Sequence, residues 1–240
     1  MITLLTAFVI VLLAAVAQAV SGFGFALVAV PLLTATTDPR TAVVVTSLTG
    51  IGLTLTVATR ERAHARWRTA GWLTAAAVAG MPVGLLVLTL APDRLLTVLI
   101  AVVVVGCAVL VWRDVRIRTG PAVVGAVGVF SGVLATSTGT NGPPLVAAFQ
   151  ALGYDPRTFR ATLAATFAGS GVLGLAGFML AGQVTPTTLA LAAAGLPAVG
   201  LGWWLGNRIF TRVDPVGFRR IVLLGLVLSA ATALTRTLTG

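Results

Sequence analysis

Residues 131–145 bring small residues, hydroxyls, an amide and helix-breaking prolines together in one short stretch, SGVLATSTGTNGPPL. Such a stretch supplies hydrogen-bond donors from its Ser, Thr and Asn side chains and from the backbone N–H groups that a broken helix leaves free. A sparser stretch of the same kind, SGFGF, occupies residues 21–25. Donors gathered without a basic side chain are suited to binding a small anion.

A short apolar helix is expected after each break, over residues 25–33 and 144–152. Pro143 and Pro144 fit a first helical turn, and Asn141 fits the position that caps it. The first turn of each helix carries roughly half a positive charge, so two such helix starts could hold one small anion. Close packing of glycines between helices is the alternative explanation. The predicted substrate-binding residues are Ser21, Gly22, Phe23, Gly24, Phe25, Ser137, Thr138, Gly139, Thr140, Asn141, Gly142 and Pro143.

A row of hydroxyls could line the path to this site. Thr158, Thr162, Thr166 and Ser170 are spaced four apart, which places them on one helix face. A shorter row lies near Ser47. Hydroxyls in helices often bond only to their own backbone, so both roles stay open. The predicted pathway-lining residues are Thr46, Thr49, Thr162, Thr166 and Ser170.

The composition places both stretches in a membrane protein. The 240-residue chain is 58% hydrophobic and 9% charged, with a mean hydropathy of +1.04. Soluble domains average about 25% charged residues, and apolar runs long enough to span a bilayer recur here. We therefore predict an all-α integral membrane protein. Irregular polar backbone at membrane depth is tolerated only where protein covers it or where it lines a cavity.

The order of the elements repeats along the chain. Residues 2–35 form an apolar region broken at 21–25; as one helix they would extend about 51 Å, against a hydrocarbon core of about 30 Å. Residues 121–153 form a second broken region, and the sequence DPRT at 38–41 recurs 117 positions later (155 − 38). We predict two inverted repeats, 1–118 and 119–240. Each has a broken or re-entrant helix region plus three transmembrane helices, about eight helical segments in all.

The sixteen arginines (the chain has no lysine) test the orientation. If the breaks are mere kinks, the arginines divide evenly between the two sides and favour no topology. If each broken region returns to its starting side, thirteen share one side: Arg60, Arg62, Arg66, Arg68, Arg113, Arg116, Arg118, Arg157, Arg160, Arg208, Arg212, Arg219 and Arg220. Arg40, Arg94 and Arg236 lie opposite. The second arrangement obeys the positive-inside rule, which makes the basic loops cytoplasmic and puts both termini outside.

The remaining ionisable groups exclude several kinds of chemistry. All six acids fall in loops or at span ends, so no ionisable group of the kind that pumps keep inside the bundle is visible: Asp38, Glu61, Asp93, Asp114, Asp155 and Asp214. One Cys and one His give no disulfide, no metal site and no nucleophile–base pair. We predict no metal, no cofactor and no enzymatic activity. Asp38 and Asp155 are expected to cap helices, with a gating pair as the alternative.

Two further patterns have plain explanations. The basic excess suits membrane topology, so no nucleic-acid partner is expected. Residues 17–19, AQA, resemble a signal cleavage site, but residues 1–20 lack the basic region that a signal peptide needs, and we expect no cleavage.

The sequence SGFGFALVAVPLL at 21–33 resembles the first motif of the sulfite exporter TauE/SafE family, and residues 132–144 resemble its second motif. The family's first motif often has a run of glycines where Phe25 and Ala26 stand here. The resemblance covers essentially the whole chain, and it implies a transporter of small sulfur-containing or organic anions, such as sulfite, sulfonates and sulfoacetate, across the bacterial inner membrane. The residues that match motif positions are Gly22, Gly24, Pro31, Gly139, Asn141, Gly142 and Pro143.

We therefore predict a multi-pass protein of the bacterial inner membrane that transports a small anion, with that anion and the lipid bilayer as its partners. A passive anion channel and a non-transporting membrane scaffold are the alternatives. The identity of the anion, the direction of transport, the coupling ion and a homo-oligomeric state are left open by the sequence.

Overall fold

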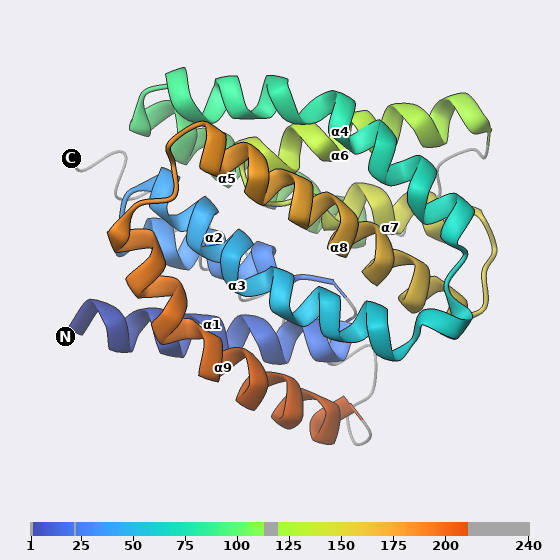
Figure 1. The fold of residues 1–240 in the computed structure, drawn as a ribbon, viewed down its shortest axis with the longest axis horizontal. Helices are drawn as coiled ribbons and strands as arrows, with labels where there is room; N and C mark the ends of the chain where they lie inside the picture. Colours follow the sequence, from blue (N-terminus) through green and yellow to red (C-terminus); the bar gives the residue numbers. More distant parts are fainter. Residues whose placement is uncertain (1, 22, 113–119, 211–240) are drawn as a thin grey trace.

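The computed structural model describes residues 2–21, 23–112 and 120–210, and these ranges contain helices and no strand (Figure 1). The first half consists of α1 (Ile2–Ser21), α2 (Phe25–Thr34), α3 (Pro39–Arg60), the 3-10 turn η1 (Arg62–His64), α4 (Trp67–Leu90) and α5 (Asp93–Trp112). The second half consists of α6 (Pro121–Ser137), α7 (Gly142–Ala151), α8 (Pro156–Leu180) and α9 (Pro186–Phe210).

Six of these helices, α1, α3, α4, α5, α8 and α9, are long and apolar enough to cross a membrane. Large apolar side chains point outward along them: Leu90 is 76% exposed and Leu180 is 90% exposed. Such side chains would be unfavourable in water and are favourable against lipid. The predicted all-α integral membrane fold is confirmed.

Each broken region is a pair of helices that turns back on itself. α1 ends at Ser21 and α2 begins at Phe25, as expected from the first break, and α6 and α7 divide around the second. In Figure 1, α1 starts at the left and α2 returns toward the left, where α3 begins; α6 starts at the right and α7 returns toward the right, where α8 begins. The prediction of about eight helical segments counted each broken region as one segment, whereas each broken region consists of two helices.

Glycine conformation explains where the chain turns. Gly24 has a φ of 110° and Gly139 a φ of 69°, both in the left-handed region that side chains with a Cβ rarely adopt. In the second break, Pro143 and Pro144 then lie in the first turn of α7, where a missing N–H costs no helical hydrogen bond.

The helices of the two halves correspond in order and run in opposite directions. Figure 1 shows α1 and α3 running from left to right and their counterparts α6 and α8 running from right to left. The most extensive helix contacts are α1 with α9 and α4 with α6, each joining the first α-helix of one half to the fourth α-helix of the other. This arrangement is the one expected of an inverted repeat.

Small residues allow these two helix pairs to approach closely. A Cβ on Gly132 of α6 would collide with the backbone carbonyl of Ala77 in α4. In the other pair, a Cβ on Gly202 of α9 would lie 2.6 Å from the Ala15 Cβ of α1. Spacings of four between small residues are typical of tight packing between membrane helices. Close packing therefore accounts for Gly132, although it lies within the second motif.

Aspartates cap two of the spans. The Asp38 carboxylate accepts a hydrogen bond from the Thr41 N–H at 2.9 Å, and Asp155 accepts from the N–H groups of Arg157 and Thr158, each at 3.1 Å. Hydrogen bonds from the Thr158 side chain and then from these backbone groups lower the pKa of Asp155. The predicted capping role of both residues is confirmed.

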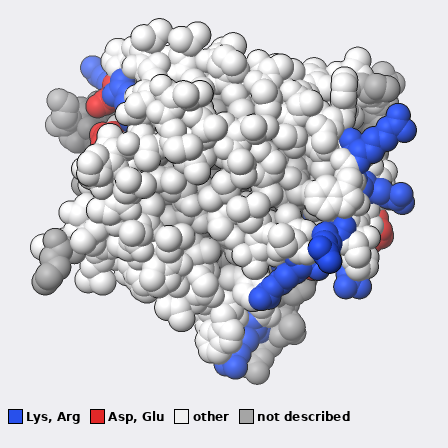
Figure 2. Space-filling view, viewed as in Figure 1, with Lys and Arg blue, Asp and Glu red and all other residues white. Residues whose placement is uncertain are grey.

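The arginines gather at one end of the bundle, which we call the basic end (Figure 2). It is the end where α3 ends, α4 and α8 begin and α9 ends, and its described arginines are Arg60, Arg62, Arg66, Arg68, Arg157, Arg160 and Arg208. Arg40 and Arg94 lie at the opposite end, where Arg40 pairs with Asp93. The other seven lie outside the described residues: Arg113, Arg116, Arg118, Arg212, Arg219, Arg220 and Arg236.

Replacing Gly132 by Ala tests the packing of α4 against α6. We expect a loss of about 1–3 kcal/mol in stability, because the added methyl group meets backbone that cannot rotate away. Gly106→Ala in α5 is the matched control, since a Cβ there has nothing within 4 Å. Thermal unfolding in detergent would compare the two variants; equal stability would contradict the packing role of Gly132.

Candidate functional site

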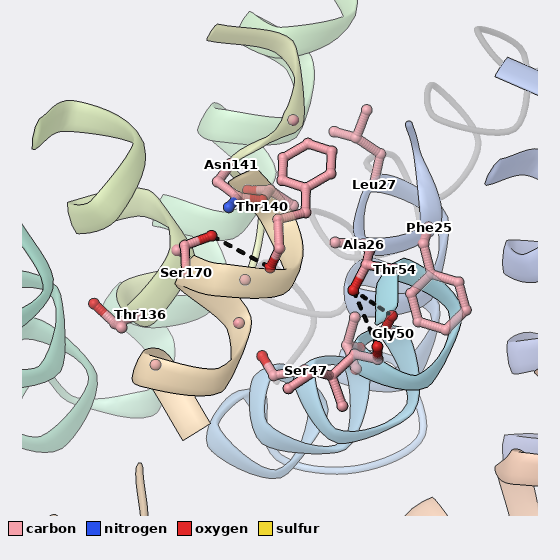
Figure 3. A pocket seen from close by; sticks show the side chains of 18 of the residues that line it. Phe25, Ala26, Leu27, Ser47, Gly50, Thr54, Thr136, Thr140, Asn141 and Ser170 are labelled. Carbon is pink, nitrogen blue, oxygen red and sulfur yellow. Dashed lines mark hydrogen bonds between the residues drawn. The ribbon is translucent and has the colours of Figure 1, made fainter. Parts of the chain in front are cut away.

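Residues of the two breaks line one cavity with a volume of about 110 Å³. By the same measure, about 10–15 Å³ is enough for one water molecule, so several waters or a small anion can fit. Figure 3 shows Thr140, Asn141 and Ser170 on one side of the cavity and Phe25, Gly50 and Thr54 on the other. Of the predicted residues, eight line it: Gly24, Phe25, Thr46, Gly139, Thr140, Asn141, Gly142 and Ser170.

Other predicted residues lie around the cavity or away from it. Phe23 packs in the neighbouring apolar clusters, and a Cβ on Gly142 would lie 3.6 Å from its Cβ. Ser21 ends α1, and Gly22 lies outside the described residues. The residues that the structure places outside the lining are Ser137, Thr138, Pro143, Thr49, Thr162 and Thr166.

The lining also contains residues that the sequence analysis did not single out as site residues. On α3, Ser47, Gly50 and Thr54 follow one another at the spacing of one helix face, and on α8 Gly171 and Gly174 flank the same face as Ser170. A search for small and hydroxyl residues at this spacing would have found them. The remaining additions are Gln18, Ala26, Leu27, Ile51, Ala135, Thr136, Phe167 and Phe178.

The start of α2 presents free donors to the cavity. Phe25, Ala26 and Leu27 all line it, and their backbone N–H groups have no hydrogen-bond acceptor in the described part of the chain. The first bond of the helix is made by the next residue, Val28, whose N–H donates to the Gly24 carbonyl at 3.2 Å. Such a helix start has the partial positive charge and the donors that bind anions.

The start of α7 contributes fewer backbone donors and one amide. Pro143 and Pro144 have no N–H, so Gly142 offers the first-turn backbone donor that lines the cavity. The Asn141 amide lines the cavity and makes no hydrogen bond to the described residues. The Ser131 hydroxyl donates to the Asn141 carbonyl at 2.9 Å, which holds the break against α6.

Most hydroxyls near the cavity are already engaged. Ser170, Ser47 and Ser137 donate to backbone carbonyls one turn earlier, at 2.8, 2.9 and 2.7 Å. Along α8, Thr162 and Thr166 do the same, and the Thr162 hydroxyl also accepts from the Arg66 N–H at 3.0 Å. Engaged hydroxyls can still accept hydrogen bonds, but their protons are committed.

The side-chain hydroxyls of Thr138 and Thr140 form a hydrogen bond in which either hydroxyl can be the donor. Their hydroxyl oxygens are 2.9 Å apart, and Thr138 can donate instead to the Leu134 carbonyl at 3.1 Å. If Thr138 donates to Thr140, the Thr140 proton is free to point into the cavity, which Thr140 lines.

Thr46 is different from every other hydroxyl of the lining. Its side chain is 2% exposed, and its Oγ1 has no hydrogen-bond partner. A buried hydroxyl without a partner costs stability, so its presence at a cavity indicates a missing ligand or water.

The cavity has no charged wall. Among the described residues that line it, none has an ionisable side chain. Its positive potential therefore comes from helix starts and polar donors. In the described ranges, no group of three His, Cys, Asp or Glu residues could hold a metal ion.

Comparison with known proteins places this architecture in a family. Neither the curated proteins nor the solved structures contain a match to the chain. The family model described as sulfite exporter TauE/SafE matches residues 7–233, which is nearly the whole chain and includes both breaks. A family of transporters agrees with the prediction that the protein is not an enzyme. The protein is thus a multi-pass membrane transporter that belongs to the sulfite exporter TauE/SafE family.

Proposed function

We propose that the protein carries a small sulfur-containing or organic anion, of the sulfite, sulfonate or sulfoacetate type, across the bacterial inner membrane. The anion binds in the cavity of about 110 Å³ between the starts of α2 and α7, which we call the central cavity. The observation that carries this proposal is the convergence of two helix starts, with unpartnered donors, on one cavity without ionisable side chains.

The donors match what an anion needs when it leaves water. Moving an anion into a membrane interior is unfavourable unless hydrogen bonds replace its hydration. The residues that carry three free N–H groups of α2, the Asn141 amide and the Thr46 hydroxyl line the same cavity, and these donors can bind a ligand without breaking an existing hydrogen bond to the described residues. Because these donors have no partner among the described protein groups, a bound anion can accept hydrogen bonds that would otherwise go to water.

We also propose that residues 1–118 and 119–240 are an inverted duplication, with the cavity at the interface of the two halves. In this arrangement, rocking of one half against the other opens the cavity to alternate sides. α3 and α8 are counterparts that pack against each other, and both line the cavity.

The proposed orientation puts the basic end in the cytoplasm and the termini outside. The described arginines divide seven to two between the ends, which supports this orientation. Because none of the described residues that line the cavity has an ionisable side chain, coupling to a proton would use the titration of the substrate, or the substrate would move down its gradient.

Binding of candidate anions by thermal shift tests the site. We expect one of sulfite, sulfoacetate, taurine, sulfate or thiosulfate to stabilise the purified protein by about 2.7 kcal/mol at a hundred times its Kd. Asn141→Ala should abolish the shift, because it removes a donor at the start of α7. Gln183→Ala, at the α8–α9 turn outside the cavity, should keep it. Absence of a shift for all five compounds, of which taurine is a zwitterionic sulfonate, would refute the proposed substrate class.

Thr46→Val tests the unpartnered hydroxyl by an almost isosteric change. We expect the anion to bind roughly 10–100-fold more weakly, because a hydrogen bond to a charged group contributes about 1.5–3 kcal/mol. Thr49→Val is the control: Thr49 is also buried on α3, but it donates to the Val45 carbonyl at 2.8 Å and does not line the cavity. Titration calorimetry would measure both; equal effects would remove Thr46 from the site.

Cysteine labelling tests the orientation in a Cys107→Ala background. We expect Arg62→Cys and Arg157→Cys to react from the cytoplasmic side with a membrane-impermeant maleimide, and Arg94→Cys to react from outside. Glu61, next to Arg62, lies 3.7 Å from the Arg157 guanidinium, so the first two sites share one end. Labelling of Arg62→Cys and Arg157→Cys from opposite sides would contradict the inverted arrangement.

A further inference from the structure

A second, smaller cavity adjoins the central cavity on the side of the basic end. Gln18, Thr54 and Phe167 line both cavities, and Arg160 and Trp203 line only the second. Its volume is about 10 Å³, which leaves room for no more than about one water molecule. The way from the central cavity toward the basic end is therefore narrow in this conformation.

Three side chains of this otherwise mostly apolar cavity are donors without a partner among the described residues: Arg160, Trp203 and Gln18. Arg160 is half-buried and forms no ion pair or hydrogen bond with the described residues. The Trp203 indole N–H is buried and has no acceptor, and the Gln18 amide makes no hydrogen bond in the described ranges. The Arg60 guanidinium lies 4.9 Å from the Trp203 ring centroid and adds a second positive charge nearby.

Phe167 stands between the two cavities. Its ring reaches the start of α7, where a Cβ on Gly142 would lie 3.8 Å from the Phe167 Cζ. A side chain that lines both cavities and reaches the second break can close the passage between them by changing its rotamer.

The corresponding positions of the first repeat hold different residues. With the repeat offset of 117, Arg160 corresponds to Val43 (160 − 117) and Phe167 to Gly50 (167 − 117). With the offset of 115 between residues 80–82 and 195–197, Trp203 corresponds to Leu88 (203 − 115). The guanidinium, the indole and the aromatic ring at these positions are therefore not repeated at the corresponding positions of the first repeat.

We infer that this second cavity is a vestibule that selects small anions at the basic end. Because this cavity has room for only about one water molecule here, an anion occupies it only when the passage widens. Arg160 then attracts the anion, the Trp203 N–H and the Gln18 amide donate hydrogen bonds to it, and Phe167 lies between it and the central site. The inference rests on the proposed function, since the vestibule leads to the proposed substrate site. The guanidinium of Arg160 also repels cations and so excludes them from the vestibule.

Charge-selective labelling of a cysteine at the junction tests the vestibule. Thr54→Cys, in the Cys107→Ala background, would be treated from the basic end with an anionic (sulfonatoethyl) and a cationic (trimethylammonioethyl) methanethiosulfonate. We expect faster reaction with the anionic reagent. Arg160→Gln should lower the ratio of anionic to cationic rates by about fivefold or more, because one unit charge close to the path is removed.

Two further variants keep the result interpretable. Arg160→Lys keeps the charge and should keep the ratio, which separates the effect of charge from misfolding. Arg62→Gln removes an arginine of the same end that does not line the vestibule and should leave the ratio unchanged. An unchanged ratio in Arg160→Gln, or failure of Thr54→Cys to react from the basic end, would overturn the inference.

The ratio of labelling rates is measured without substrate, so the vestibule and the proposed function can be refuted independently of each other. A ratio that depends on Arg160, together with no anion-induced thermal shift, would support the vestibule and refute the substrate class. A thermal shift abolished by Asn141→Ala, together with a ratio independent of Arg160, would support the central site and refute the vestibule.

Discussion

The structure depends on one constraint: a polar break in a membrane helix must be covered by protein, because lipid offers it no hydrogen bonds. The two breaks cover each other. A Cβ on Gly139 of the second break would lie 3.0 Å from the Val30 side chain of α2, and Gly142 faces Phe23 of the first break. The residues whose donors this mutual burial leaves unpaired line the shared cavity, so the fold and the proposed binding site have the same physical origin.

Packing between the halves holds the breaks in place. α1 packs on α9 and α4 packs on α6, so each half contributes one helix to each of the two contacts. Glycines such as Gly202 and Gly132 bring backbones together at these contacts, where lipid provides no hydrophobic driving force and dispersion must suffice. The centre of the bundle, between α3 and α8, is left for small residues and the cavity.

Much of this could be predicted from local signals. Glycine and proline mark the breaks, Asp38 and Asp155 mark helix starts, and the arginines divide between two ends, because each of these effects acts within one turn or one loop. Which hydroxyl side chains face the cavity could not be predicted in the same way. Thr46 and Thr49 lie three apart on α3, yet Thr46 lines the cavity, whereas Thr49 meets α9, where a Cβ on Gly195 would lie 3.1 Å from it. Which of the two faces the cavity is decided by a helix almost 150 positions away in the sequence (195 − 49 = 146).

The placement of charge follows from the cost of burying it. Two helix starts together supply about one positive charge, which would balance a singly charged anion. This charge comes from backbone dipoles, so no charged side chain has to lose its water when the protein folds. A guanidinium in the central cavity would be costly whenever the site is empty. Arg160, only half-buried near the basic end, keeps contact with water and can still act on an approaching anion. In the proposed mechanism, attraction at Arg160 is separate from binding at the breaks. This separation would allow the central site both to bind and to release its ligand, since no charged side chain among the described lining residues would hold the anion there.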